Sequence, residues 1–215
     1  VHHFDIMAGY EWQHFHQKGE KDGWGWIPET NTESPNSEYK RESQVWKTES
    51  YLVSFFGRAN YSLLDRYLFT VTVRHDGSSR FKEHWATFPS FALGWKIKEE
   101  AFLKDVNWLS DLKLRLGYGQ TGQQEKIGDY NYFVSYNVNT KEDSYYPLIG
   151  NGVLNRPNAY NLDLTWETTT TYNAGLDFGF LDNRITGSVD YYFRETTDLL
   201  NTVYVSAGTN FRNKV

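Results

Sequence analysis

Large apolar and polar side chains alternate with a period of two along most of this chain. This is the pattern of a β-strand that has one apolar and one polar face. In the first such segment, from Phe4 to Trp12, the large apolar residues fall on even positions. The pattern predicts an all-β, antiparallel fold of seven strands, at residues 4–12, 51–62, 67–76, 90–97, 112–119, 167–180 and 185–194.

Two architectures fit this pattern: a soluble β-sandwich, and a transmembrane β-barrel whose apolar face contacts lipid. Strand length favours the barrel, because most strands run about ten residues or more, against ~5–6 in soluble proteins and ~9–11 for a tilted membrane strand. The connections also alternate in length, as they do between the short periplasmic turns and long extracellular loops of outer-membrane barrels. We expect tight turns at 62–66 and 181–184, a moderate one at 98–110, and long loops at 17–44, 122–165 and after 198.

The polar faces of the strands carry charged groups in mid-strand, which suits a water-filled lumen better than the outer face of a small sandwich. The residues predicted to face this lumen are Arg58, Arg74, Asp76, Arg115, Glu167, Asp177 and Arg194. On the apolar face, Tyr61 and Tyr67 flank one tight turn, and Phe178, Phe180 and Ile185 flank the other. Aromatic rings at these positions would form an interfacial girdle, although aromatic residues favour strands in any case.

The amino-acid composition excludes several classes of function. A net charge of −5 argues against nucleic-acid binding, and the absence of cysteine excludes disulfide scaffolds, thiol nucleophiles and cysteine-based metal sites. The sequence has no run of ~18 consecutive apolar residues, so we expect no transmembrane helix, and its first residues do not have the pattern expected of a signal peptide. Aromatic residues make up 18% of the chain, which is typical of a β-protein or of a sugar-binding protein.

Seven strands in one sheet leave two open edges, which lipid does not tolerate. The chain also begins in mid-strand and ends in a predicted loop. We therefore expect a fragment of a larger barrel.

Aromatic residues in the predicted loops are the best candidates for ligand contact, because flat rings stack on the apolar faces of sugars. They are Trp24 and Trp26 in one loop, Trp85 in another, and Tyr145, Tyr146 and Tyr160 in a third. The alternative, that these rings pin the loops to one another or to a partner protein, stays open.

Three other motifs have weaker functional readings. Residues 117–122 satisfy G-x-G-x-x-G, but no helical pattern follows, so a dinucleotide site is not expected. His14 and His16 share one face, yet no third metal ligand is evident, which favours a surface position. Asp163 and Glu167 could act as glycosidase carboxylates, but barrel lumens carry such groups routinely. We expect no catalytic residue, cofactor or metal site.

Short blocks in chain order carry a family resemblance. They include Gly117-Tyr118-Gly119-Gln120-Thr121-Gly122, and together they comprise residues 60–81, 87–90, 94–95, 100–103, 108–115, 117–122, 164–169, 173–178, 183–192 and 197–200. These blocks resemble the SusC/RagA family of TonB-dependent outer-membrane transporters of Bacteroidetes. They cover most of residues 50–215.

The resemblance implies a bacterial outer-membrane barrel of about 22 strands, filled by a plug domain. Such proteins import oligosaccharides or peptides with a SusD-like surface lipoprotein and are energised through TonB–ExbB–ExbD. Residues 1–215 would then be part of the barrel domain, in contact with lipid and with the remaining barrel and plug, while plug and TonB box are absent from this chain. The alternative is a soluble all-β carbohydrate-binding module or glycosidase accessory domain.

Overall fold

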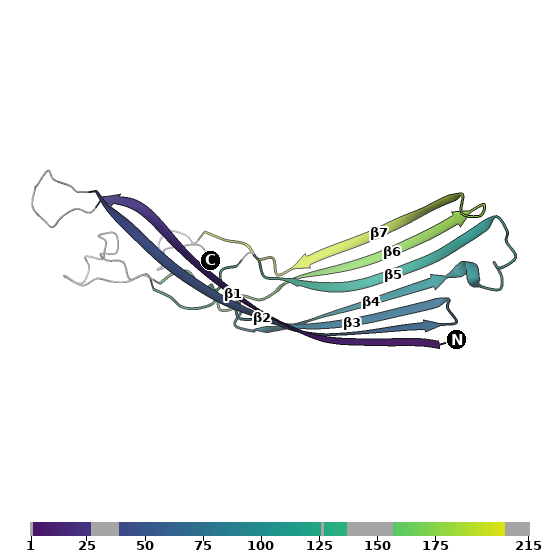
Figure 1. The fold of residues 1–215 in the computed structure, drawn as a ribbon, viewed down its shortest axis with the longest axis horizontal. Helices are drawn as coiled ribbons and strands as arrows, with labels where there is room; N and C mark the ends of the chain where they lie inside the picture. The colour runs from purple at the N-terminus through teal and green to yellow at the C-terminus, as the bar shows by residue number, and fades with distance from the viewer. Residues whose placement is uncertain (1, 27–38, 126, 137–156, 205–215) are drawn as a thin grey trace, which may run out of the picture.

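The computed structural model describes residues 2–26, 39–125, 127–136 and 157–204. They form one antiparallel sheet in which the strands follow their order in the chain (Figure 1). The elements are β1 (His2–Trp26), β2 (Tyr39–Leu63), β3 (Tyr67–Ser78), β4 (Trp85–Lys96), the 3-10 turn η1 (Ile97–Glu99), β5 (Leu109–Gln123), β6 (Glu167–Phe180) and β7 (Ile185–Thr197). The predicted all-β class and the seven antiparallel strands are confirmed.

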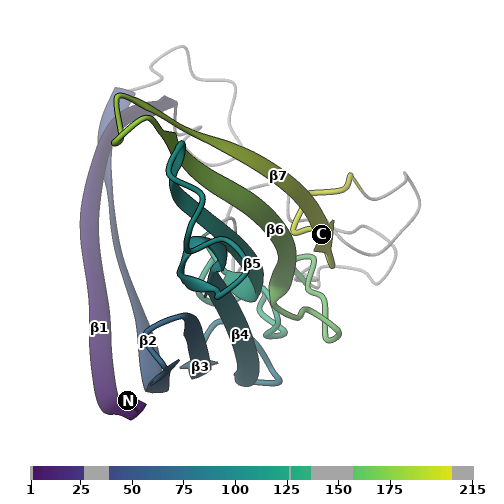
Figure 2. The same ribbon diagram turned by 90° about the vertical axis from the view of Figure 1, so that its right-hand side faces the viewer.

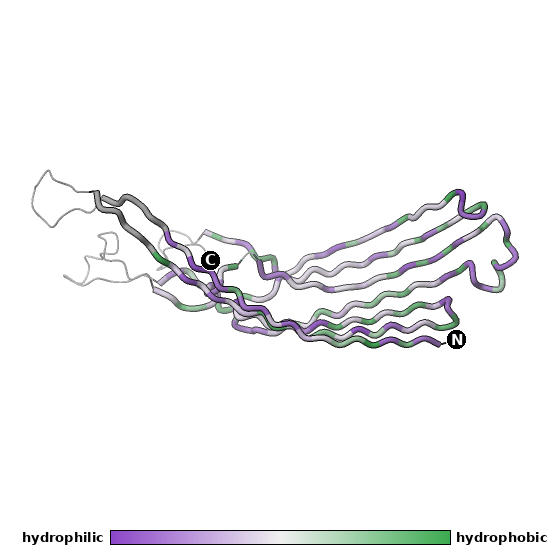
Figure 3. The backbone as a smooth tube through the Cα atoms, viewed as in Figure 1, coloured by the Kyte–Doolittle hydropathy of each residue, from purple (hydrophilic) through white to green (hydrophobic). Residues whose placement is uncertain are grey.

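The register of the strands gives the sheet two uniform faces. One row of directly paired residues crosses all seven strands, and every member is apolar: Phe4, Tyr61, Phe69, Leu93, Leu116, Ala174 and Tyr191. The residues next to this row are mostly polar, so hydropathy alternates along each strand (Figure 3). The apolar face has no second layer in the described part of the chain, and Val71 is 39% exposed. A β-sandwich, which buries this face against another sheet, is therefore wrong.

The sheet is strongly curved, as Figure 2 shows from one end. Polar-face residues of β1 to β5, among them Gln13, Thr72 and Ser90, line a common cavity. Residues on one face converge in this way only when that face is concave. The polar face is thus the inside of the curve, and the apolar face is the outside.

Short turns gather at one end of the sheet. Leu64, Asp65 and Arg66 connect β2 to β3, and a 3.1 Å hydrogen bond from Arg66 N–H to the Leu63 carbonyl closes the turn. Leu64 and Asp65 have positive φ, which matches the twist of the flanking strands. The turn between β6 and β7 closes with a 3.2 Å hydrogen bond from Arg184 N–H to the Leu181 carbonyl. Both tight turns agree with the sequence prediction. None of the described residues forms a helix of the length and apolarity needed to cross a bilayer.

The strands at the other end run further than predicted. Strands β3, β5 and β7 end at Ser78, Gln123 and Thr197 rather than at 76, 119 and 194, and the larger differences are in β1, β2 and β4. Residues 17–44 were expected to be a loop, but β1 continues to Trp26 and β2 starts at Tyr39, paired throughout. Strand β4 begins at Trp85 rather than at residue 90. Its first residues pair with β3 but not with β5, so Pro89, which lacks an N–H donor, lies where one side of the strand is unpaired.

A small hydrophobic cluster closes the concave face near the long connections. Its buried members are Phe81, Phe88, Ile127, Trp166 and Leu200. The Trp166 ring lies 4.9 Å from Phe81 and 5.6 Å from Phe88, measured between ring centroids. The connections after β3, β5 and β7 therefore fold inward onto the sheet and provide the walls of a site.

Candidate functional site: a polar pocket on the concave face

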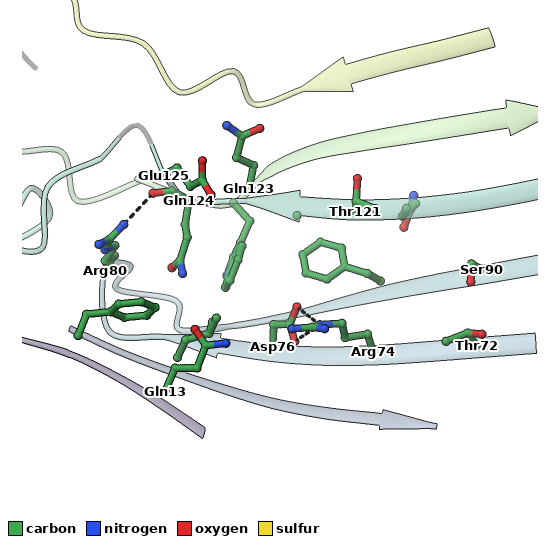
Figure 4. Close-up of a pocket in the computed structure, with 16 residues that line it drawn as sticks. Gln13, Thr72, Arg74, Asp76, Arg80, Ser90, Thr121, Gln123, Gln124 and Glu125 are labelled. Atoms are coloured by element: carbon green, nitrogen blue, oxygen red, sulfur yellow. Dashed lines mark hydrogen bonds and ion pairs between the residues drawn. The ribbon is translucent and has the colours of Figure 1, made fainter. Parts of the chain in front are cut away.

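A pocket of about 710 Å³ lies between the concave face and these inward-folded connections (Figure 4). Phe88 and Trp166 supply an apolar part of its lining. The labelled side chains in Figure 4 are polar and come from β1, β3, β4, β5 and the connections: Gln13, Thr72, Arg74, Asp76, Arg80, Ser90, Thr121, Gln123, Gln124 and Glu125. Amides, hydroxyls and charges beside two aromatic rings suit a polar ligand that has apolar faces.

An ion pair on β3 organises the wall of the pocket. Arg74 Nε lies 2.8 Å from both carboxylate oxygens of Asp76. The same guanidinium donates to the Ser54 hydroxyl at 3.0 Å and approaches Glu11 at 3.5 Å. Asp76 and Ser54 are buried, whereas Arg74 is only half-buried. The buried carboxylate thus fixes a cation whose remaining surface faces the cavity.

A second arginine holds the connections in place. Arg80 Nε donates to Asp129 at 2.9 Å, and its Nη1 donates to the Gln124 carbonyl at 3.3 Å. The Ser78 hydroxyl also donates to the Gln124 side chain. The chain after β5 is thereby tied to the end of β3, which keeps the pocket wall in position.

A separate ionic cluster crosses the polar face nearer to the short turns. Arg115 binds Asp177 through two hydrogen bonds of 2.9 Å and Asp190 through bonds of 3.0 and 3.1 Å. The cluster passes directly over Gly175, where a Cβ would lie 2.8 Å from Arg115 Nη2. Glycine at this position leaves room for one arginine to join three strands.

The structure places all seven polar residues of the sequence prediction on this concave face. Arg74 and Asp76 lie in the pocket, and Arg115 and Asp177 lie in the second cluster. Arg58 donates to Thr72 at 3.1 Å, Arg194 is directly opposite Thr171, and buried Glu167 accepts the Leu200 N–H at 3.0 Å. That this face lines an aqueous lumen stays a prediction.

Of the predicted loop aromatics, Trp85 and Tyr160 have side chains among the described residues, and these two lie at different places. Trp85 is not in a loop: it begins β4 on the apolar face, where it stacks on His75 at 4.8 Å and covers Gly77. Trp24 and Trp26 belong to β1 rather than to a loop, and their side chains lie outside the described residues, as do Tyr145 and Tyr146. Tyr160 lines another cavity, of about 310 Å³, together with Leu164 and Leu200.

Two of the three other motifs have structural explanations. Residues 117–122 lie within β5, so the G-x-G-x-x-G match lies inside a strand rather than at the strand-to-helix turn that a dinucleotide site requires. Glu167 caps the backbone at Leu200, while Asp163 is exposed in the preceding connection. Sequence reasoning missed Gln13 and the run 120–125 as pocket residues. The feature of the sequence that could have revealed them is the three glutamines in the run 120–125.

A curved antiparallel sheet with a continuous apolar outer face and a charged inner face is the wall of a transmembrane β-barrel. The comparisons with known proteins agree. The family model described as "TonB dependent receptor-like, beta-barrel" matches residues 2–214. The chain belongs to this family.

The chain is similar to several members over three quarters or more of its length. It is 56% identical over 97% of its length to the TonB-dependent receptor SusC of Bacteroides thetaiotaomicron, of which it covers 21%. It is 38% identical over 77% of its length to the TonB-dependent receptor P39 of Formosa agariphila, covering 16% of that protein. The chain thus spans about a fifth of the length of these relatives.

Solved structures show the same arrangement. A structure of the RagAB peptide transporter matches 98% of this chain and 24% of the solved chain, with a TM-score of 0.70 and 30% identity. The RagAB peptide importer in its 'closed-closed' state matches with the same TM-score and identity. The predicted resemblance to SusC and RagA is confirmed. Since the family comprises TonB-dependent receptors rather than enzymes or sugar-binding modules, the soluble alternative is set aside.

Proposed function

We propose that this chain forms part of the barrel wall of a TonB-dependent importer in the bacterial outer membrane. The observation that carries the proposal is the 56% identity to SusC over 97% of the chain, on a sheet whose outer face is apolar and uncovered. Strands of this length can cross a bilayer, and the apolar row would contact its hydrocarbon core. The complete protein would close about 22 strands around a plug.

In this proposal the pocket forms part of the path of an imported oligosaccharide or peptide. Its amide and hydroxyl groups can bind sugar hydroxyls or peptide backbone, and Trp166 and Phe88 can pack against apolar faces. The long connections at the same end would face outward and meet a SusD-like lipoprotein. Trp24, Trp26, Tyr145, Tyr146 and Tyr160 would lie on that side and are proposed to contact cargo or lid. The plug and the TonB–ExbB–ExbD system would act from elsewhere in the complete protein.

Fractionation and growth test the proposal. The complete protein should be found in the outer-membrane fraction, and a strain deleted for its gene should lose growth on either defined oligosaccharides or defined peptides as carbon source. Complementation should depend on TonB. Recovery of the intact protein as a soluble, folded monomer, or unchanged growth on both substrate classes, would contradict the proposal.

Pocket residues can be tested against a matched position. Gln13→Leu and Gln123→Leu remove hydrogen-bonding groups from the pocket lining without adding charge, so uptake or binding of the cargo should fall about tenfold or more. Ser188→Ala changes the same face near the short turns, outside the pocket lining, and should leave uptake unchanged. Equal effects at all three positions would show that the pocket does not select cargo.

A further inference from the structure

A second site lies on the outer face of the β1–β2 hairpin, away from the polar pocket. His14 and His16 on β1 and Glu49 on β2 place one possible ligand atom each within 4.8 Å of one another, and no other such group occurs among the described residues. His16 is directly opposite Glu49 in the strand register, and His14 is two residues away on the same face. The third ligand that the sequence did not reveal is therefore supplied by the neighbouring strand.

We propose that His14, His16 and Glu49 bind a divalent transition-metal cation, with Zn²⁺ as the best fit. Two imidazoles and one carboxylate are an established zinc ligand set, and the fourth position can be occupied by water. Ligand atoms in a tetrahedral zinc site lie about 3.3 Å apart, since each metal–ligand bond is about 2.0–2.2 Å. The three side chains are exposed or half-buried, so small rotations would bring their ligand atoms from within 4.8 Å of one another to the spacing of a zinc site.

The surroundings already restrict the side chain of one ligand, His14, and the backbone of another, Glu49. The His14 ring stacks on Tyr51, with centroids 4.5 Å apart and planes 5° apart. The Tyr130 hydroxyl accepts the Glu49 N–H at 3.2 Å and so ties this part of β2 to the connection after β5. Restricted ligands lose less conformational entropy when a metal binds. Both histidines are exposed, so an ion from the medium can reach them.

Lys47 competes with the metal for the same oxygen. Its Nζ lies 2.6 Å from Glu49 Oε1, which also lies 3.3 Å from His16 Nδ1. A metal ion that coordinates this oxygen must displace the ammonium group, because two cations cannot share so short a contact. Removal of the Lys47 charge should therefore strengthen metal binding, whereas removal of a ligand should weaken it.

Bound metal would act as a clip between β1 and β2. Strand β1 is an edge of the described sheet, so β2 is its one strand partner there. A coordinate bond from each strand to one ion adds a link that must break before the hairpin opens. This clip is independent of the proposed import function and of its cargo.

Zinc binding to the complete protein, purified in detergent without a polyhistidine tag, tests the site. After chelator treatment, titration calorimetry with ZnCl₂ should show a binding event that His14→Ala and His16→Ala each weaken at least about tenfold, and that Glu49→Gln weakens by a similar factor. Lys47→Met should tighten the same event several-fold. His3→Ala is the matched control, because His3 lies on the same strand at its other end, 3.7 Å from Asp65, and should leave it unchanged.

The ligand variants should bind zinc more weakly and Lys47→Met should bind it more tightly, and this difference in direction distinguishes loss of the metal site from misfolding. Loss of the fold would separate the three ligands, which lie on two strands, so a gain in Lys47→Met supports the site even if a histidine variant folds poorly. Zinc binding that survives the double substitution of His14 and His16, or the absence of any zinc binding by the wild type, would overturn the proposal.

Discussion

At the scale of single residues, Asp76 shows how the concave face tolerates charge. Asp76 is only 7% exposed, and its carboxylate accepts a bifurcated hydrogen bond from the Nε–H of Arg74. Asp76→Asn keeps the shape but removes the negative charge and replaces one acceptor by a donor that faces the guanidinium. We expect the free energy of unfolding to fall by about 1–2 kcal/mol, a value reduced for the partial exposure of Arg74. Urea unfolding of the complete protein in lipid vesicles measures this change.

Ser54→Ala is the control for this prediction. Ser54 is fully buried and contacts the same guanidinium at 3.0 Å, but it contributes one neutral acceptor. Its loss should cost less than the loss of the Asp76 charge. If the serine variant is the less stable of the two, the ion pair does not organise this wall.

Individual residues also show where sequence reasoning stops. Alternation placed Arg74, Asp76, Arg115 and Asp177 on one face correctly, because period two decides the face of a strand residue. It did not pair Arg115 with Asp177, which lies in another strand across a long connection. Pairing of this kind depends on the register between strands, and the sequence of one strand does not contain it.

At the scale of elements, strands were predictable only where one face is apolar. The predicted limits of β6, residues 167–180, match the structure, since alternation continues along the whole strand. The extension of β1 beyond Gln17 was missed because Lys18-Gly19-Glu20-Lys21-Asp22 has no apolar face. Backbone hydrogen bonds to β2 maintain that extension. A strand without an apolar face cannot be detected from the alternation of apolar and polar residues.

The short-turn end offers a prediction about acid. Glu100 accepts hydrogen bonds from the Tyr67 hydroxyl at 2.6 Å and from Trp95 Nε1 at 3.1 Å, and Arg66 lies 3.4 Å away. These donors, Tyr67 first, hold the pKa of the Glu100 carboxyl below its usual value of 4.5. A lowered folded-state pKa stabilises the protein above the unfolded-state value, and this contribution is lost as the pH falls through the folded-state pKa. Glu100→Gln should therefore lower the unfolding temperature at about pH 7, and this difference from the wild type should shrink as the pH falls below the unfolded-state pKa.

The difference between variant and wild type is the quantity to measure, since other carboxylates titrate in the same range. Glu99→Gln removes the neighbouring exposed carboxylate and is the matched control. It should leave the unfolding temperature nearly unchanged across this pH range. A stability difference for Glu100→Gln that persists at low pH would show that the amide disturbs packing rather than charge.

At the scale of the whole molecule, one prediction follows from the assignment of faces. Val71 lies in the middle of β3 on the apolar face, and Ala92 lies on the polar face of β4, paired with the neighbouring Thr70. The two positions thus lie at nearly the same height on opposite sides of the sheet. Val71→Arg places a charge in hydrocarbon and should cost about 2–4 kcal/mol if the position lies near the bilayer midplane.

Ala92→Arg places the same group on the concave side, near the polar side chains of Thr70 and Asn173, and should cost little if water fills that side. The folded fraction of the complete protein in lipid vesicles, titrated with urea, compares the two variants directly. Both substitutions are large, so overpacking alone would penalise them similarly. Equal destabilisation would mean that lipid does not contact the Val71 face, whereas a selective loss for Val71→Arg assigns hydrocarbon to the convex face and water to the concave one. The pocket, the ionic cluster and the proposed path of cargo all lie on the side that this comparison assigns to water.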